Sequence, residues 1–260
     1  MRHNKLLLIG LFLLMGLPIN AMDDGDIMND DDMRQAIQDD DVDWTRHLLD
    51  MRLQTEPDFR VGVLLQWAET VQMATVLIDE YGADVNERFN AEYQTNLTPL
   101  DTVKTKQVAE LLLDRGADLH DRTKGRDTPL HRATLADNIP VMEALLARGT
   151  NPNLQGIEGN TALMYATTLS ALNNSSEKHS NRIRKVRLLL SHGADPSIAN
   201  YGGNRPITSA KEYGFDELTH LFKPFERQQK LLFLLRANKA PNIIILLRNR
   251  ELYGTFHSPH

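Results

Sequence analysis

The sequence predicts an all-α solenoid, in which helix-turn-helix units stack and are joined by β-turn fingers. The related strings "TPLHRA" and "NTALMYA" align at Thr128 and Thr161, which are 33 residues apart. A triplet that begins with Gly stands 12 residues before the start of three units, at Thr128, Thr161 and Arg205. Self-similarity at a period of roughly 20 to 50 residues is the signature of repeats that stack into a solenoid.

The unit that begins at Thr128 shows how the pattern specifies two helices. Pro129–Leu135 predicts the first helix, with Thr128 as its N-cap and Pro129 at the first helical position, where a missing N–H is tolerated. Pro140 is expected to open the second helix. That helix must end at Gly149, the residue type that most easily takes the positive φ of a helix terminus.

The neighbouring units differ in length. Thr98 precedes Thr128 by only 30 residues, and we expect the three missing residues to come from the end of a first helix. Arg205 follows Thr161 by 44 residues, which is an 11-residue insertion. We assign the insertion to the polar stretch 170–181 and expect a loop there, because loops absorb added length at little free-energy cost.

The period, the "TPLH" string and the "GAD" triplets at Gly116 and Gly193 resemble the ankyrin repeat. The resemblance implies five or six repeats over residues 33–222, and residues 1–21 predict that this repeat protein is exported and of a bacterial type. It also implies that His131 supports the neighbouring turn by hydrogen bonding rather than acting in catalysis. One departure is Gly125, which stands one position away from the expected finger glycine and leaves the geometry of that tip open.

The N-terminal region differs from the repeats. Residues 1–21 have a basic start, a 12-residue apolar run at 6–17 and a small residue at Ala21, which is typical of a secretory signal peptide. An uncleaved anchor or a buried helix is the alternative, but the run is shorter than the about 20 residues that cross a bilayer. Residues 22–32 are rich in Asp and predict an acidic disordered tail, with calcium binding as the alternative.

The C-terminal region, residues 223–260, has two short apolar runs separated by charges. It predicts a helical cap, because the last repeat of a solenoid must have its apolar face covered. A membrane-binding or partner-binding helix is the alternative.

Composition and motifs limit the chemistry. The net charge of -6 argues against a nucleic-acid partner, and the absence of Cys excludes thiol catalysis and disulfides. No catalytic motif is recognisable, so we expect no enzyme, no cofactor and no metal. We also expect a monomer with no membrane span in the mature chain. A cryptic hydrolase or metal site built on the insertion and the acidic tail is kept as an alternative.

The predicted function is binding of a protein partner in the periplasm or outside the cell. Ankyrin repeats typically bind through a concave face made of the fingers and first helices, and by register the sequence places exposed positions there. The expected binding residues are Phe89, Tyr93, Lys124, Arg126, Asp127, Arg132, Ile157, Glu158, Asn160, Tyr165, Tyr201, Asn204 and Ser209. A periplasmic protein that protects an exported enzyme, or that neutralises a toxin, is the alternative function.

Overall fold

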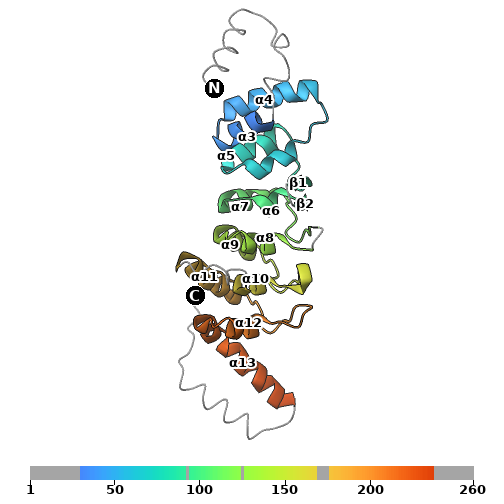
Figure 1. Ribbon diagram of the computed structural model, residues 1–260. Helices are drawn as coiled ribbons and strands as arrows, with labels where there is room; N and C mark the ends of the chain where they lie inside the picture. Colours follow the sequence, from blue (N-terminus) through green and yellow to red (C-terminus); the bar gives the residue numbers. More distant parts are fainter. Residues whose placement is uncertain (1–29, 92–93, 124–125, 169–175, 237–260) are drawn as a thin grey trace, which may run out of the picture. The chain divides into compact units, whose positions relative to one another are not determined.

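The computed structural model describes residues 30–91, 94–123, 126–168 and 176–236 (Figure 1). The chain divides into two compact units, unit 1 at Met1–Asp118 and unit 2 at Leu119–His260. Helices dominate the described residues of both units, so the predicted all-α class is confirmed. The predicted signal peptide and most of the predicted acidic tail lie outside the described residues, as does the chain after Arg236.

Unit 1 contains a series of short helices and one hairpin. Its elements are α3 (Asp30–Gln38), α4 (Val42–Thr55), the 3-10 helix η2 (Val61–Trp67), α5 (Val71–Thr75), the π-helix η3 (Val76–Glu80), β1 (Phe89–Ala91), β2 (Gln94–Leu97), α6 (Pro99–Thr102) and α7 (Lys106–Asp114). Strands β1 and β2 are antiparallel, with Phe89 opposite Leu97. Leucines from six of these elements contribute to the core, and all are at most 2% exposed: Leu48, Leu49, Leu64, Leu65, Leu77, Leu97, Leu100 and Leu112.

The start of α3 corrects the N-terminal expectation. Asp30, Asp31 and Asp32, which the composition assigned to a disordered tail, form the first turn of this helix. Carboxylates are favoured at this position because they lie at the positive end of the helix dipole. Met33, Ala36 and Ile37 then bury the other face of α3.

The unit at Thr98 is shortened at the place that the sequence predicted, the end of its first helix. Helix α6 has four residues, against seven in α8 (Pro129–Leu135). The short helix keeps its N-terminal cap, because the backbone N–H of Thr98 donates to Asp101 Oδ2 at 3.0 Å. The deletion therefore removes the end of the helix and spares its start.

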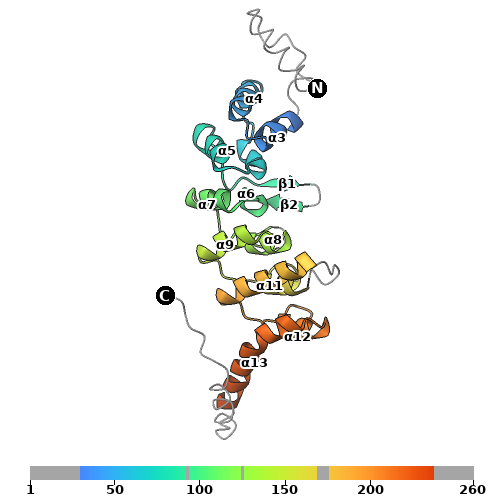
Figure 2. The same ribbon diagram turned by 90° about the vertical axis from the view of Figure 1, so that its left-hand side faces the viewer.

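Unit 2 repeats a pair of helices. Its elements are α8 (Pro129–Leu135), α9 (Ile139–Ala147), the 3-10 turn η4 (Ile157–Gly159), α10 (Ala162–Thr168), α11 (Ser176–Ser191), α12 (Pro206–Glu212) and α13 (Asp216–Arg236). Helix α10 packs between α8 and α12 (Figure 1), and α11 packs between α9 and α13 (Figure 2). The first helices of the repeats thus form one layer and the second helices another.

The helix limits expected around Thr128 are nearly correct. Helix α8 spans the predicted residues. Helix α9 begins one residue earlier than expected, because Asn138 caps it by accepting the N–H of Val141 at 3.2 Å. Gly149 has the predicted positive φ, at 83°.

An Asn side chain ties successive turns together in each unit. In unit 1, Asn86 Nδ2 donates to the carbonyl of Gly116 (3.0 Å), and Asn86 Oδ1 accepts the N–H of Asp118 (2.8 Å). In unit 2, Asn153 makes the same pair of bonds with the turn at 193–195. Both amide groups satisfy backbone atoms that the helix termini leave unpaired.

The insertion is a correction to the sequence analysis. Residues 176–181, expected in a loop, form the start of α11, which has 16 residues against nine in α9. The segment contains neither Gly nor Pro, so nothing in it stops the helix from extending. The rest of the insertion lies outside the described residues.

The C-terminal boundary expected at residue 223 falls inside a helix. Helix α13 continues from Asp216 to Arg236, with Pro224 in its interior. Pro224 removes one backbone donor but is flanked by good helix formers, among them Leu221 and Glu226. None of the helices in the described part of the chain has the length and apolar character needed to cross a membrane.

Helix α11 carries two buried cationic side chains that its sequence pattern does not predict. Arg182 is 1% exposed and lies over the ring of Phe215, 3.9 Å from its centroid, and burial lowers the pKa of its guanidinium. Lys185 is 2% exposed. Its Nζ donates to the carbonyl of Thr134 (3.1 Å), in the last turn of α8, and to the carboxylate of Asp137. A cation is favoured there by the negative end of the helix dipole.

We expect Lys185→Ala to lower the free energy of unfolding by about 2 kcal/mol, because it removes the charged hydrogen bond to the Thr134 carbonyl, which then keeps only backbone donors such as the more distant N–H of Asp137 (3.4 Å). Asp137 adds little to this loss, since its side chain is 39% exposed and can be hydrated. Urea denaturation followed by circular dichroism measures the change. The control is Arg187→Ala, on the exposed side of the same helix, which should change stability by less than about 0.5 kcal/mol. Equal losses in the two variants would contradict the assignment.

Candidate functional site

The three fingers of unit 2 share one backbone design. Each is closed by a hydrogen bond from the N–H of one residue to the carbonyl four residues later. The three bonds are Thr123 to Asp127 (3.1 Å), Gly156 to Asn160 (2.8 Å) and Asn200 to Asn204 (2.8 Å). The donors are separated by the same 33 and 44 residues that separate the units in sequence, so the insertion leaves the finger geometry intact.

The last tip residue of each finger has a left-handed backbone conformation. It is Arg126 (φ 71°) in the first finger, Gly159 (φ 74°) in the second and Gly203 (φ 80°) in the third. Residues 124 and 125 lie outside the described residues, and at the next position the first finger has an arginine where the other two have glycine.

A buried carboxylate fastens the first finger to the second. Asp127 is 1% exposed, and its Oδ1 accepts the backbone N–H of Ile157 (3.0 Å) and the hydroxyl of Tyr165 (3.2 Å). A Cβ atom at position 156 would collide with this oxygen, so only Gly fits there. The position of the second fingertip is therefore set by a side chain of the first finger.

His131, four residues after Asp127, joins the same pair of repeats. It is 1% exposed, and the backbone N–H of Thr128 donates to its Nδ1 (3.2 Å). Nε2 therefore carries the hydrogen and donates it to the carbonyl of Asn160 (3.1 Å). Burial lowers the pKa of His131, although the nearby Asp127 carboxylate opposes this. The predicted turn-supporting role of His131 is confirmed.

Tyr165 completes this buried network. Its ring meets His131 edge to face, with 5.7 Å between centroids, and its pKa is raised to about 12 by burial and by Asp127. Both ring nitrogens of His131 are occupied by its structural bonds, which leaves neither available as a catalytic base. Within the described residues, no group of three or more His, Asp or Glu side chains is arranged to hold a metal.

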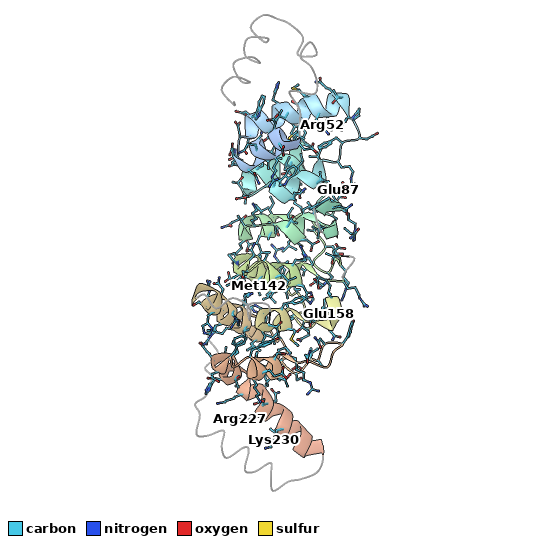
Figure 3. All side chains as sticks on the ribbon, viewed as in Figure 1. Arg52, Glu87, Met142, Glu158, Arg227 and Lys230 are labelled. Carbon is cyan, nitrogen blue, oxygen red and sulfur yellow. The ribbon has the colours of Figure 1, made fainter. Side chains whose placement is uncertain are left out.

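Two large apolar side chains are exposed on adjacent fingertips. Ile157 is 44% exposed and Tyr201 is 67% exposed. The backbone N–H of Tyr201 donates to the carbonyl of Glu158 at 2.9 Å, so the second and third tips are directly bonded. The Tyr201 ring lies against Gly159, where a Cβ atom would come within 2.5 Å of it. Glu158 is exposed on the same tip and has a φ of 54° (Figure 3).

The remaining predicted binding residues of unit 2 divide by exposure. Arg126 and Asn204 are exposed, and Arg132 and Asn160 are half-buried. Lys124 lies outside the described residues, as does Tyr93 of unit 1. Arg205, exposed at the base of the third finger, was missed, although its presence where the other units have Thr is a signal the sequence contains.

The expected exposure is wrong for four residues. Asp127 and Tyr165 are buried because they bond to each other across the repeat boundary. Ser209 is 4% exposed because it faces the sulfur of Met164 on the preceding first helix. Phe89, in unit 1, is 7% exposed and belongs to the β-hairpin rather than to an open fingertip.

The lowered pKa of His131 predicts an acid-sensitive unit 2. In the unfolded chain this His binds a proton near pH 6.5, whereas the folded protein resists protonation, so the unfolded state binds more protons below that pH. The free energy of unfolding should therefore decrease as the pH falls from about 7.5 through 6.5 and toward the lower folded pKa. Comparing urea denaturation at pH 7.5 and 5.5 measures this decrease, and His131→Gln should reduce it.

The matched control is His192→Gln, because His192 is exposed and this change should leave the pH dependence as in the wild type. If wild type and His131→Gln lost stability in parallel on acidification, the role assigned to the His131 ring would be wrong.

Comparison with known proteins agrees with this geometry. A family model described as ankyrin repeats (3 copies) matches residues 101–200. A crystal structure of an ankyrin repeat domain from Acinetobacter baumannii superposes with a TM-score of 0.59 at 27% identity, covering 75% of this chain and 97% of that one.

Relatives are found at the sequence level as well. The human transient receptor potential cation channel subfamily A member 1 is 32% identical over 164 residues, and this chain spans only 14% of its length while 60% of this chain is matched. A putative ankyrin repeat protein of Acanthamoeba polyphaga mimivirus is 31% identical over 119 residues, which cover 41% of this chain and 72% of that protein. The repeated fingers, the paired helices and these similarities together show that the chain belongs to the ankyrin-repeat family.

Proposed function

We propose that unit 2 binds a protein partner through its fingertips and the adjacent face of its first helices. The observation that carries this proposal is the exposure of Ile157 and Tyr201 on neighbouring tips. Tyr is among the residues enriched at protein interfaces, because it offers a large contact area with a polar end. Val71 and Tyr213 are the other large hydrophobic side chains that are strongly exposed in the described residues, and neither lies on these fingers.

The fingers are prepared for binding before a partner arrives. The Ile157 backbone is held by Asp127, and the Tyr201 backbone is held by the carbonyl of Glu158. A side chain presented from a fixed backbone loses less conformational entropy on binding than one on a loose loop. The same polar network that joins the repeats thus favours recognition at their tips.

The double change Ile157→Ser and Tyr201→Ser should abolish binding of the partner while leaving the fold intact, because both side chains are exposed. Affinity capture with wild-type and variant chains, quantified by mass spectrometry, measures the loss, and circular dichroism checks the helix content. The matched control is Tyr213→Ser, an exposed Tyr (54%) in the same unit but away from the fingers. Retention of every captured protein by the double variant would contradict the proposal.

We further propose that the protein acts in an exported compartment. The basic start and apolar run of residues 1–21 support this part of the proposal. Expression of the full chain in a bacterial host, followed by fractionation and N-terminal sequencing, should yield periplasmic or secreted protein that starts after Ala21. Protein that stays in the cytoplasm with residues 1–21 attached would contradict export, and would leave the binding proposal standing.

A further inference from the structure

The backbone at Arg126 is kept in a conformation that its side chain does not favour. At φ 71° it occupies the position that glycine fills in the next two fingers. A residue with a Cβ atom in this region is strained by roughly 1–2 kcal/mol relative to glycine. Strained positions of this kind gather at functional sites, where the side chain contributes more than its conformation costs.

The fold itself gives no reason for the Arg126 side chain. The side chain is exposed, and among the described residues it makes no hydrogen bond or ion pair; only its backbone is engaged, donating to Thr123 and accepting from Arg122. The two carboxylates of the same finger, Asp121 and Asp127, are 9% and 1% exposed. The finger therefore keeps its negative charge inside and presents a guanidinium at its tip.

The sequence of unit 2 has a positive formal charge, whereas that of unit 1 is negative. Leu119–His260 contains 19 Lys and Arg residues against 12 Asp and Glu residues, whereas Met1–Asp118 contains 10 against 23. Arg205 adds a second exposed arginine, at the base of the third finger. The apolar pair Ile157 and Tyr201 stands on the two fingertips that follow Arg126 along the chain, and Glu158 is the exposed carboxylate of the middle tip.

We propose that this face of unit 2 binds an acidic segment of a protein, with a carboxylate of that segment paired to Arg126 and an apolar side chain held against Ile157 and Tyr201. This inference rests on the proposed function, because it specifies the chemistry of the partner at the same face. Glu158 fixes the register of the segment, since it repels a carboxylate placed over the middle tip. The guanidinium suits this role because its planar donor fork matches a carboxylate with two hydrogen bonds.

Selection of peptides tests the chemistry directly. The full-length chain is used to select from a phage-displayed library of random linear peptides. The selected peptides should be richer in Asp and Glu than the unselected library and should contain an apolar or aromatic residue. A selected set without acidic enrichment, or a set enriched in Lys and Arg, overturns the inference. Failure to select any peptide overturns it as well.

Substitutions at Arg126 then separate binding from folding. Arg126→Gly should raise the melting temperature by about 2–4 °C, because it relieves the backbone strain, and should weaken the selected acidic peptide about tenfold. Arg126→Lys should keep most of the affinity, and that affinity should fall with added salt. The control Arg184→Ala removes an exposed arginine from α11 and should change neither quantity. Unchanged peptide affinity in Arg126→Gly would overturn the role of this residue.

The outcomes distinguish this inference from the proposed function. A natural partner that depends on Ile157 and Tyr201 but binds Arg126→Gly at full affinity sinks the acidic-segment proposal and keeps the binding face. If the double variant and Arg126→Gly both still capture the partner, the acidic-segment proposal and the proposed binding face are both wrong.

Discussion

The buried carboxylate of Asp127 is the contact on which the arrangement of the first two fingers of unit 2 depends. Burying a carboxylate is unfavourable unless hydrogen bonds replace its hydration, and at Oδ1 of Asp127 they come from the following repeat, through the Ile157 amide and the Tyr165 hydroxyl. Asp127 of the first finger therefore has these hydrogen bonds only when the second repeat is folded against it. His131 reinforces this dependence by bonding to Asn160 across the same boundary.

In this unit, the bonds that stack the repeats also hold the backbone of the exposed fingertip residues. Ile157 is exposed at a tip whose amide is held by Asp127, and Tyr201 is exposed at a tip whose amide is held by the carbonyl of Glu158. The apolar side chains are thus displayed by backbone that the repeat interface has already ordered. The contacts between repeats stabilise the scaffold, and the exposed side chains of the tips can vary without changing those contacts.

The sequence predicted those features that depend on neighbours in the chain. The cap at Thr128, the helix Pro129–Leu135 and the shortened helix after Thr98 all follow from local signals, and all are present. Three of the side chains that fail the exposure prediction, Asp127, Tyr165 and Ser209, have partners 30 or more residues away, which periodicity does not encode. The same reason explains why Lys185, 48 residues from Asp137, was not foreseen as a buried cation.

Part of the inserted length has become helix. Helix α11 is seven residues longer than α9, yet the fingers on either side of it keep the same closing hydrogen bond. The layer of second helices in unit 2 can therefore change in length independently of the layer of first helices. During evolution, such a repeat can gain residues in its second helix without altering the backbone of the fingertips. The size of the repeat and the side chains on its tips can therefore change separately in one chain.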